Sequence, residues 1–88
     1  MTQSQINFLK ILTDEVKERD EKVFTVLMPA LVALGVVTEE KIAVIFEVAV
    51  ITVQSWAKGT VRPNPILRHK MYEWLLDQVN QLHPEYPQ

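Results

Sequence analysis

Basic side chains are the residues in this chain whose types could do chemistry, and four of the nine Lys and Arg residues fall in one segment. Lys58, Arg62, Arg68 and Lys70 fall within residues 48–72, a stretch that contains no Asp or Glu. Ammonium and guanidinium groups bind phosphate oxygens, so this segment is suited to contacts with a nucleic-acid backbone. From charge alone, a solvated helix and loop is an equally good interpretation.

Catalytic chemistry has little support in the residue pattern. Ser4 and Ser55 have no histidine and acid at a recognisable triad spacing, and there is no glycine-rich phosphate loop. Cysteine is absent, and His69 and His83 alone cannot complete a metal site. We therefore expect a protein that is not an enzyme and has no metal and no cofactor. The sequence also gives no sign of a small-molecule ligand.

Length and composition fit one domain with a single core. The chain has 88 residues, 48% of them apolar, and a net charge of −2. Its longest apolar run, residues 23–37, is interrupted by Thr25, Pro29 and Gly35 and falls short of the roughly 18 residues of a membrane-spanning helix. The N-terminus lacks the pattern of a signal peptide. We therefore expect a cytoplasmic protein with no membrane segment.

Helical periodicity marks the start of the chain. Apolar residues at spacings of three and four predict an amphipathic helix from residue 5 to about residue 19, with Phe8 and Ile11 widening its buried stripe. The core of that stripe is Ile6, Leu9, Leu12 and Val16. Glu15 with Arg19, and Glu18 with Lys22, are acid-before-base pairs that would support the solvent-facing side.

A second helical pattern covers residues 23–34 and continues through Pro29. Proline inside a helix costs roughly 3 kcal/mol, because it lacks the N–H and its ring clashes with the preceding turn. We therefore expect a break or a kink near Met28. Pro29 should then lie in the first turn of a shorter helix that ends at Gly35.

Residues 39–59 begin with a helix-capping signal. Thr38 supplies an N-cap hydroxyl, and Glu39 and Glu40 place negative charge at the positive end of a helix that starts at Glu39. By propensity alone, the β-branched and aromatic run over residues 42–53 would also suit a strand. The cap and the stop at Gly59 favour helices.

The last helix is predicted to begin at Asn64 and Pro65, a favourable pair for the N-cap and the first helical position. Its apolar spacing continues to about Leu82. Tyr72 and Leu76 fall off the main stripe and are interpreted as isolated exposed residues, with a subunit contact as the alternative.

Residues 39–58 resemble the twenty-residue helix-turn-helix of the Cro and lambda-repressor (XRE-type) superfamily. The fifth position of that pattern is small because two helices cross there, and here it is Ala43. The fourth, eighth, tenth, fifteenth and eighteenth positions are apolar, and here they are Ile42, Phe46, Val48, Val53 and Trp56. The ninth is usually glycine, because the turn prefers a positive φ. Here it is Glu47, which would strain the backbone by roughly 1 kcal/mol.

This resemblance implies an all-α, compact bundle of five to six helices containing a repressor-like helix-turn-helix. Residues 1–88 would form a single helical domain, with an N-terminal extra helix at residues 5–20 and a repressor-like core at residues 23–82. The implied function is that of a small transcriptional regulator that binds double-stranded DNA. A homodimer is expected, since one recognition helix covers too few base pairs for useful specificity.

The resemblance also assigns site residues. The recognition helix would span residues 49–58. The candidate contacts to DNA bases are Val50, Ile51, Gln54, Ser55 and Lys58. Among them Gln54 is suited to adenine, because its amide can both accept and donate hydrogen bonds. The candidate contacts to phosphates, which position the protein without reading sequence, are Thr60, Arg62, Arg68, His69 and Lys70.

A protein-interaction module with the same helix-turn-helix fold is the alternative function. Glu39 and Glu40 at the start of the motif would face the DNA backbone unfavourably, and the net charge is negative. Val50 and Ile51 are adjacent apolar residues that would suit a contact with a protein, such as a regulator or an antitoxin-like partner.

Overall fold

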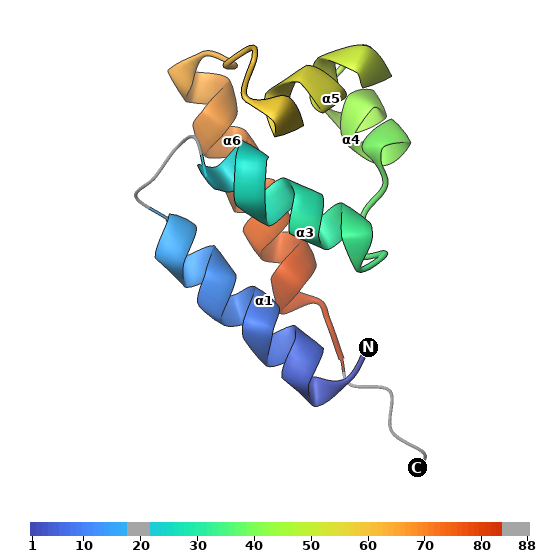
Figure 1. The fold of residues 1–88 in the computed structure, drawn as a ribbon, viewed down its shortest axis with the longest axis vertical. Coiled ribbons are helices and arrows are strands. Elements are labelled where there is room, and N and C mark those ends of the chain that lie inside the picture. Colours follow the sequence, from blue (N-terminus) through green and yellow to red (C-terminus); the bar gives the residue numbers. More distant parts are fainter. Residues whose placement is uncertain (18–21, 84–88) are drawn as a thin grey trace.

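Helices make up the fold. The computed structural model describes residues 1–17 and 22–83, and within these ranges it contains five α-helices, one π-helical turn and no strand. In chain order the elements are α1 (Gln3–Val16), η1 (Val23–Leu27), α3 (Met28–Ala33), α4 (Glu39–Ile45), α5 (Val50–Lys58) and α6 (Pro65–Asn80) (Figure 1). The predicted all-α class is confirmed, and the β-branched run is helical on both sides of a turn. No helix in the described ranges is long and apolar enough to cross a membrane.

One apolar core connects the elements. The α1 helix packs against α6 and η1, and α5 packs against η1 and α4. The buried residues at the centre of these contacts are Leu9, Val16, Leu27, Leu31, Ile42, Val53, Trp56, Met71, Leu75 and Val79. Burying one large apolar side chain contributes about 1.5–3 kcal/mol. Helices as short as α3 and α4 therefore depend on this core, because isolated helices of their length are not stable in water.

The α1 helix begins two residues before the predicted start. The Thr2 hydroxyl accepts a hydrogen bond from the Gln5 N–H, and the Gln5 side chain accepts one from the Thr2 N–H. This reciprocal pair is a capping box, and it sets the first helical residue at Gln3. The predicted helix end at residue 19 and the pairs Glu15–Arg19 and Glu18–Lys22 involve residues outside the described ranges.

The prediction that Phe8 and Ile11 widen the buried stripe of α1 is wrong. Their side chains are 54% and 61% exposed, respectively. They lie outside the side of α1 that carries Ile6, Leu9 and Val16 into the core, so more than half of each side chain remains exposed. Thr13 occupies the buried side instead, and its hydroxyl donates to the Leu9 carbonyl oxygen at 2.6 Å. That bond satisfies a polar group that would otherwise be costly to bury.

A change of helix type accommodates Pro29. The Met28 N–H donates to the Val23 carbonyl oxygen five residues back, so η1 is a turn of π-helix, and α3 starts at Met28 with Pro29 in its first turn. In a regular α-helix Pro29 could not donate to Thr25, and its ring would clash with that carbonyl. The wider π turn relieves the clash. We predicted a break or a kink near Met28, whereas the backbone stays helical there and changes only from π to α type. The predicted place of Pro29, in the first turn of a shorter helix, is confirmed.

Three helices end in the same left-handed turn. The turn residue is Gly35 after α3 (φ 77°), Gly59 after α5 (φ 77°) and Glu47 after α4 (φ 55°). After α4, the Val48 N–H donates to the Ala43 carbonyl oxygen, five residues back, at 3.0 Å, and the Glu47 N–H donates to the Val44 carbonyl oxygen at 3.3 Å. These are the two bonds of a Schellman motif. Within the described ranges, Glu47 is the only residue other than glycine with a positive φ.

The starts of α4 and α6 agree with the predictions from their caps. The Thr38 hydroxyl accepts from the Lys41 N–H at 3.0 Å, and the Asn64 side chain accepts from the Leu67 N–H at 2.9 Å. The α5 helix starts one residue later than predicted, because Ala49 has an extended conformation as its N-cap.

Tyr72 and Leu76 are half-buried, which corrects their interpretation as isolated exposed residues. The Tyr72 hydroxyl donates to the Thr13 carbonyl oxygen at 3.2 Å and so links α6 to α1. Periodicity within α6 could not show this, because the neighbouring helix comes from the other end of the chain. The α6 helix ends at Asn80, two residues before the predicted end.

Candidate functional site

The α4–α5 unit, residues 39–58, is held by the inward positions that the sequence predicted. Four of these six residues are buried and two are half-buried against the core: Ile42, Ala43, Val53 and Trp56, then Phe46 and Val48. The Trp56 ring lies 5.8 Å from the Phe24 ring of η1, and the Phe46 ring meets the Trp74 ring of α6 edge-on at 5.7 Å. Such aromatic pairs are specific in geometry, so they help to fix the orientation of the α4–α5 unit on the bundle.

The connection between the two helices keeps its left-handed turn although glycine is absent from it. Glu47 has a φ of 55°, a conformation that costs a residue with a Cβ roughly 1 kcal/mol or more. Such strain persists only where the surrounding structure determines the backbone. Here the packing of Phe46 and Val48 on either side of the turn does so.

Four of the five candidate base contacts share one side of α5. Ile51, Gln54, Ser55 and Lys58 follow the spacing of three and four residues that puts side chains on the same side of a helix. Ile51 is 66% exposed, Lys58 is exposed, and Gln54 and Ser55 are partly exposed. Val50 lies to the side and packs half-buried against the core, so the structure does not bring it together with the other four.

The two polar residues at the centre of this side already have hydrogen-bond partners. The Gln54 amide nitrogen donates to a Glu39 carboxylate oxygen of α4 at 3.4 Å, a long and therefore weak bond. The Ser55 hydroxyl donates to the Ile51 carbonyl oxygen at 3.0 Å. Gln54 retains its carbonyl oxygen and a second N–H for an incoming ligand, and Ser55 retains its acceptor lone pairs.

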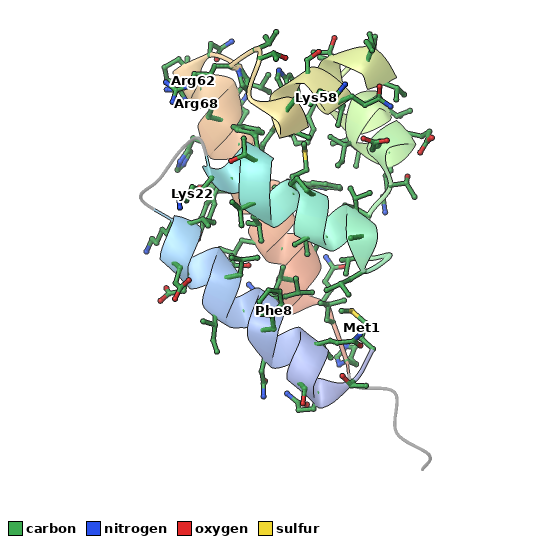
Figure 2. All side chains as sticks on the ribbon, viewed as in Figure 1. Met1, Phe8, Lys22, Lys58, Arg62 and Arg68 are labelled. Atoms are coloured by element: carbon green, nitrogen blue, oxygen red, sulfur yellow. The ribbon has the colours of Figure 1, made fainter. Side chains whose placement is uncertain are left out.

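Three of the basic residues lie at one end of the molecule. Figure 2 shows Lys58, Arg62 and Arg68 at the end where α5 passes through a loop into α6. Lys58 and Arg62 are exposed, whereas Arg68 is half-buried and its guanidinium donates to the Pro63 carbonyl oxygen at 2.9 Å. In the same loop, the Thr60 hydroxyl donates to the Ser55 carbonyl oxygen at 3.1 Å.

His69 and Lys70 are exposed on α6, beyond the loop. A Glu73 carboxylate oxygen lies 2.8 Å from the His69 Nε2 atom, and both side chains are more than 60% exposed. An anion at His69 would therefore have to compete with the Glu73 carboxylate. Lys70 is the better placed of the two for a phosphate.

Two apolar residues of α4 are also exposed, and they were not among the residues predicted from the sequence. Val44 is 77% exposed and Ile45 is 42% exposed, on the helix that precedes Ile51. Val44 is the sixth residue of the twenty-residue pattern, and the sixth position is not among the inward positions of that pattern. The same pattern could therefore have identified it. The pairing of Glu39 with Gln54 across α4 and α5 had no comparable local signal.

Comparisons with models of protein families, with curated proteins and with solved structures found no match. In the part of the chain that the structure describes, no group of three or more His, Cys, Asp or Glu residues is placed to hold a metal ion. Function is therefore inferred from the α4–α5 unit and from the charges around it.

Proposed function

We propose that this chain is a small DNA-binding transcriptional regulator of the repressor-like helix-turn-helix type, with α5 as its recognition helix. The observation that carries the proposal is the exposed side of α5, on which Ile51, Gln54, Ser55 and Lys58 stand together. A recognition helix lies in the major groove and reads base edges from such a side. The left-handed turn at Glu47 supports the same assignment, because it stands at the position where the repressor-like pattern requires a positive φ.

Each residue on this surface has a role that its chemistry allows. Gln54 reads adenine through its amide, and it gives up its weak bond to Glu39 when a base edge competes. Ile51 contacts a thymine methyl group, while Val50 supports it from the side of the core. The loop and the start of α6 then supply the phosphate contacts, from Lys58, Thr60, Arg62, Arg68, His69 and Lys70.

We propose that the regulator is a homodimer. One short recognition helix reads too few base pairs for useful specificity, and a two-fold dimer doubles the site. Phe8 and Ile11 are large apolar residues exposed one turn apart on the outer side of α1. In an antiparallel contact between two α1 helices, Phe8 of one copy faces Ile11 of the other, which is the self-complementary geometry that a two-fold interface needs.

A salt titration of binding to random duplex DNA tests the DNA-binding proposal. Affinity should fall steeply with salt concentration, because Lys58, Arg62 and their neighbours displace counterions from phosphates. Lys58→Ala or Arg62→Ala should each reduce the slope of log K against log salt by about one. Lys10→Ala is the matched control. Lys10 is exposed on α1, a helix that supplies none of the proposed DNA contacts, and its removal should leave the slope unchanged.

A protein-interaction module remains the second candidate, and one observation favours it. Val44, Ile45 and Ile51 expose apolar surface on adjacent helices, and the acidic residues Glu40 and Glu47 flank that surface. If no binding to duplex DNA is detected even at low salt, the DNA-binding proposal is wrong and the apolar surface becomes the site to test. A chemical-shift map with and without DNA would locate the face that is used.

A further inference from the structure

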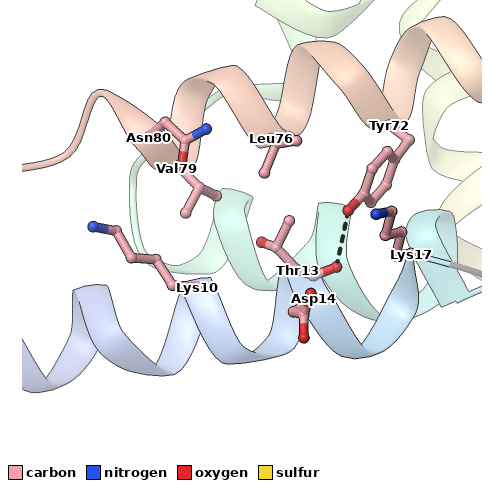
Figure 3. A pocket seen from close by; sticks show the side chains of 8 residues that line it. All are labelled: Lys10, Thr13, Asp14, Lys17, Tyr72, Leu76, Val79 and Asn80. Carbon is pink, nitrogen blue, oxygen red and sulfur yellow. Dashed lines mark hydrogen bonds between the residues drawn. The ribbon is translucent and has the colours of Figure 1, made fainter.

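A groove of about 250 Å³ runs between α1 and α6, on a part of the molecule that the proposed DNA contacts do not use. Its lining comes from both helices: Lys10, Thr13, Asp14 and Lys17 from α1, and Tyr72, Leu76, Val79 and Asn80 from α6. The hydrogen bond from the Tyr72 hydroxyl to the Thr13 carbonyl oxygen crosses the groove and links the two helices (Figure 3).

Positive charge dominates the groove although the whole chain has a net charge of −2. Figure 3 shows the Lys10 and Lys17 side chains reaching into the space between α1 and α6, whereas the Asp14 carboxylate points away from α6. Neither ammonium group forms an ion pair with a carboxylate of a residue that the structure describes. The groove therefore carries two ammonium groups and one carboxylate, and neither ammonium group is held in an ion pair with Asp14.

The floor between the two lysines is apolar. Val79 is buried and Leu76 is half-buried, and both line the groove. Lys10 and Lys17 stand seven residues apart on one helix, which is about 10 Å along the axis. A ligand complementary to this groove has an apolar middle, which contacts Leu76 and Val79, and an acidic group at each end, which reaches Lys10 or Lys17.

We propose that the α1–α6 groove binds a small organic anion, an apolar chain or ring about 10 Å long that carries a carboxylate or phosphate at each end. The acid groups pair with the Lys10 and Lys17 ammonium groups as charge-assisted hydrogen bonds. The apolar middle lies on Leu76 and Val79, and the Asn80 amide supplies a further donor at the Lys10 end. This site is separate from α5 and does not depend on the proposed function.

Titration with octanedioate, followed by amide chemical shifts in the full chain, tests this proposal. Octanedioate has two carboxylates at nearly the required spacing and an apolar chain between them. We expect saturable shifts on both sides of the groove, near Thr13 on α1 and near Leu76 and Val79 on α6. Succinate, which is too short, and octane-1,8-diol, which is uncharged, should each bind at least fivefold more weakly. Thermal unfolding gives a second measurement, because a ligand that binds only the folded state raises Tm.

Two lysine variants and a control identify the groove as the site. Lys10→Gln and Lys17→Gln should each weaken octanedioate binding by up to about fivefold, the effect of removing one exposed ion pair. Lys41→Gln removes an exposed lysine of α4 and should change nothing. The proposal is overturned if none of the anions gives saturable shifts at millimolar concentrations. It is equally overturned if succinate binds as well as octanedioate, or if Lys41→Gln weakens binding as much as Lys17→Gln does.

Discussion

At position 47, a glutamate holds a left-handed backbone conformation that favours glycine. The same turn ends α3 and α5, and there the chain uses both of its glycines. The place of Glu47 in the repressor-like pattern identified it as the residue at which a positive φ is usual. The pattern could not show whether the chain would keep the turn at the cost of strain. The packing of Phe46 and Val48 decided that point, since both residues must reach the core from opposite sides of the turn.

Replacement of Glu47 by glycine should stabilise the fold. The substitution removes the Cβ that opposes a φ of 55°, at the expense of a more flexible unfolded chain, so the expected net gain is up to about 1 kcal/mol. Urea denaturation measures it as a higher midpoint with an unchanged m-value.

The opposite change at Gly35 is the matched control for Glu47→Gly. Gly35 has a φ of 77°, and a Cβ added there would meet no atom within 4 Å. Gly35→Ala should therefore lose about 1 kcal/mol through backbone strain alone. If Glu47→Gly instead destabilised the protein by a similar amount, the left-handed turn after α4 would be contradicted.

At the scale of elements, the orientation of α5 depends on Trp56. This side chain is 97% buried by η1 and the rest of the core, with the Phe24 ring 5.8 Å away. Because α5 has only nine residues, it has little stability of its own and takes its position from such contacts. The position of the exposed side that carries Gln54 and Lys58 therefore depends on the packing of Trp56 into the core.

Trp56→Ala should lower the free energy of unfolding by roughly 3–5 kcal/mol, the usual cost of removing a buried aromatic side chain. Trp56→Phe keeps an aromatic ring against Phe24 and should lose clearly less. Both values come from urea denaturation monitored by far-UV circular dichroism. A loss well under 1 kcal/mol for the alanine variant would mean that Trp56 does not face the core.

At the scale of the whole molecule, the surface divides into separate regions. The α5 side and the basic loop lie at one end, the positively charged groove lies between α1 and α6, and Phe8 and Ile11 stand on the outer side of α1. The three proposed partners, which are DNA, a small anion and a second copy of the chain, would therefore not compete for the same residues.

The proposed homodimer gives a prediction at this scale. Replacing Phe8 and Ile11 together by serine should shift the chain from dimer to monomer in sedimentation velocity, because both residues lose their apolar contact with the second copy. Val44→Ser is the control, since Val44 is even more exposed but lies on α4. A concentration of about 100 μM is well above the dissociation constants of most specific complexes. If the unmodified chain sediments as a monomer at that concentration, the dimer proposal is wrong.

Short-range signals in the sequence by themselves determined where most helices begin and end. Thr38 and Asn64 cap helices at the predicted starts, Gly35 and Gly59 end them, and Pro29 marks the change near Met28. These features were predictable because a cap or a proline acts on backbone groups a few residues away. The same holds for the inward positions of the α4–α5 unit, whose spacing follows from the helical repeat.

Only the tertiary structure decided which apolar residues are covered and which polar groups meet. Phe8 and Ile11 fit an apolar stripe as well as Leu12 does, yet they are more than half exposed, because α6 and η1 pack on the side of α1 that carries Leu9 and Val16. Tyr72 reaches Thr13 across 59 residues of sequence, and both residues line the groove between their helices. Periodicity describes one helix at a time, whereas burial and binding surfaces depend on which helices the shared core brings together.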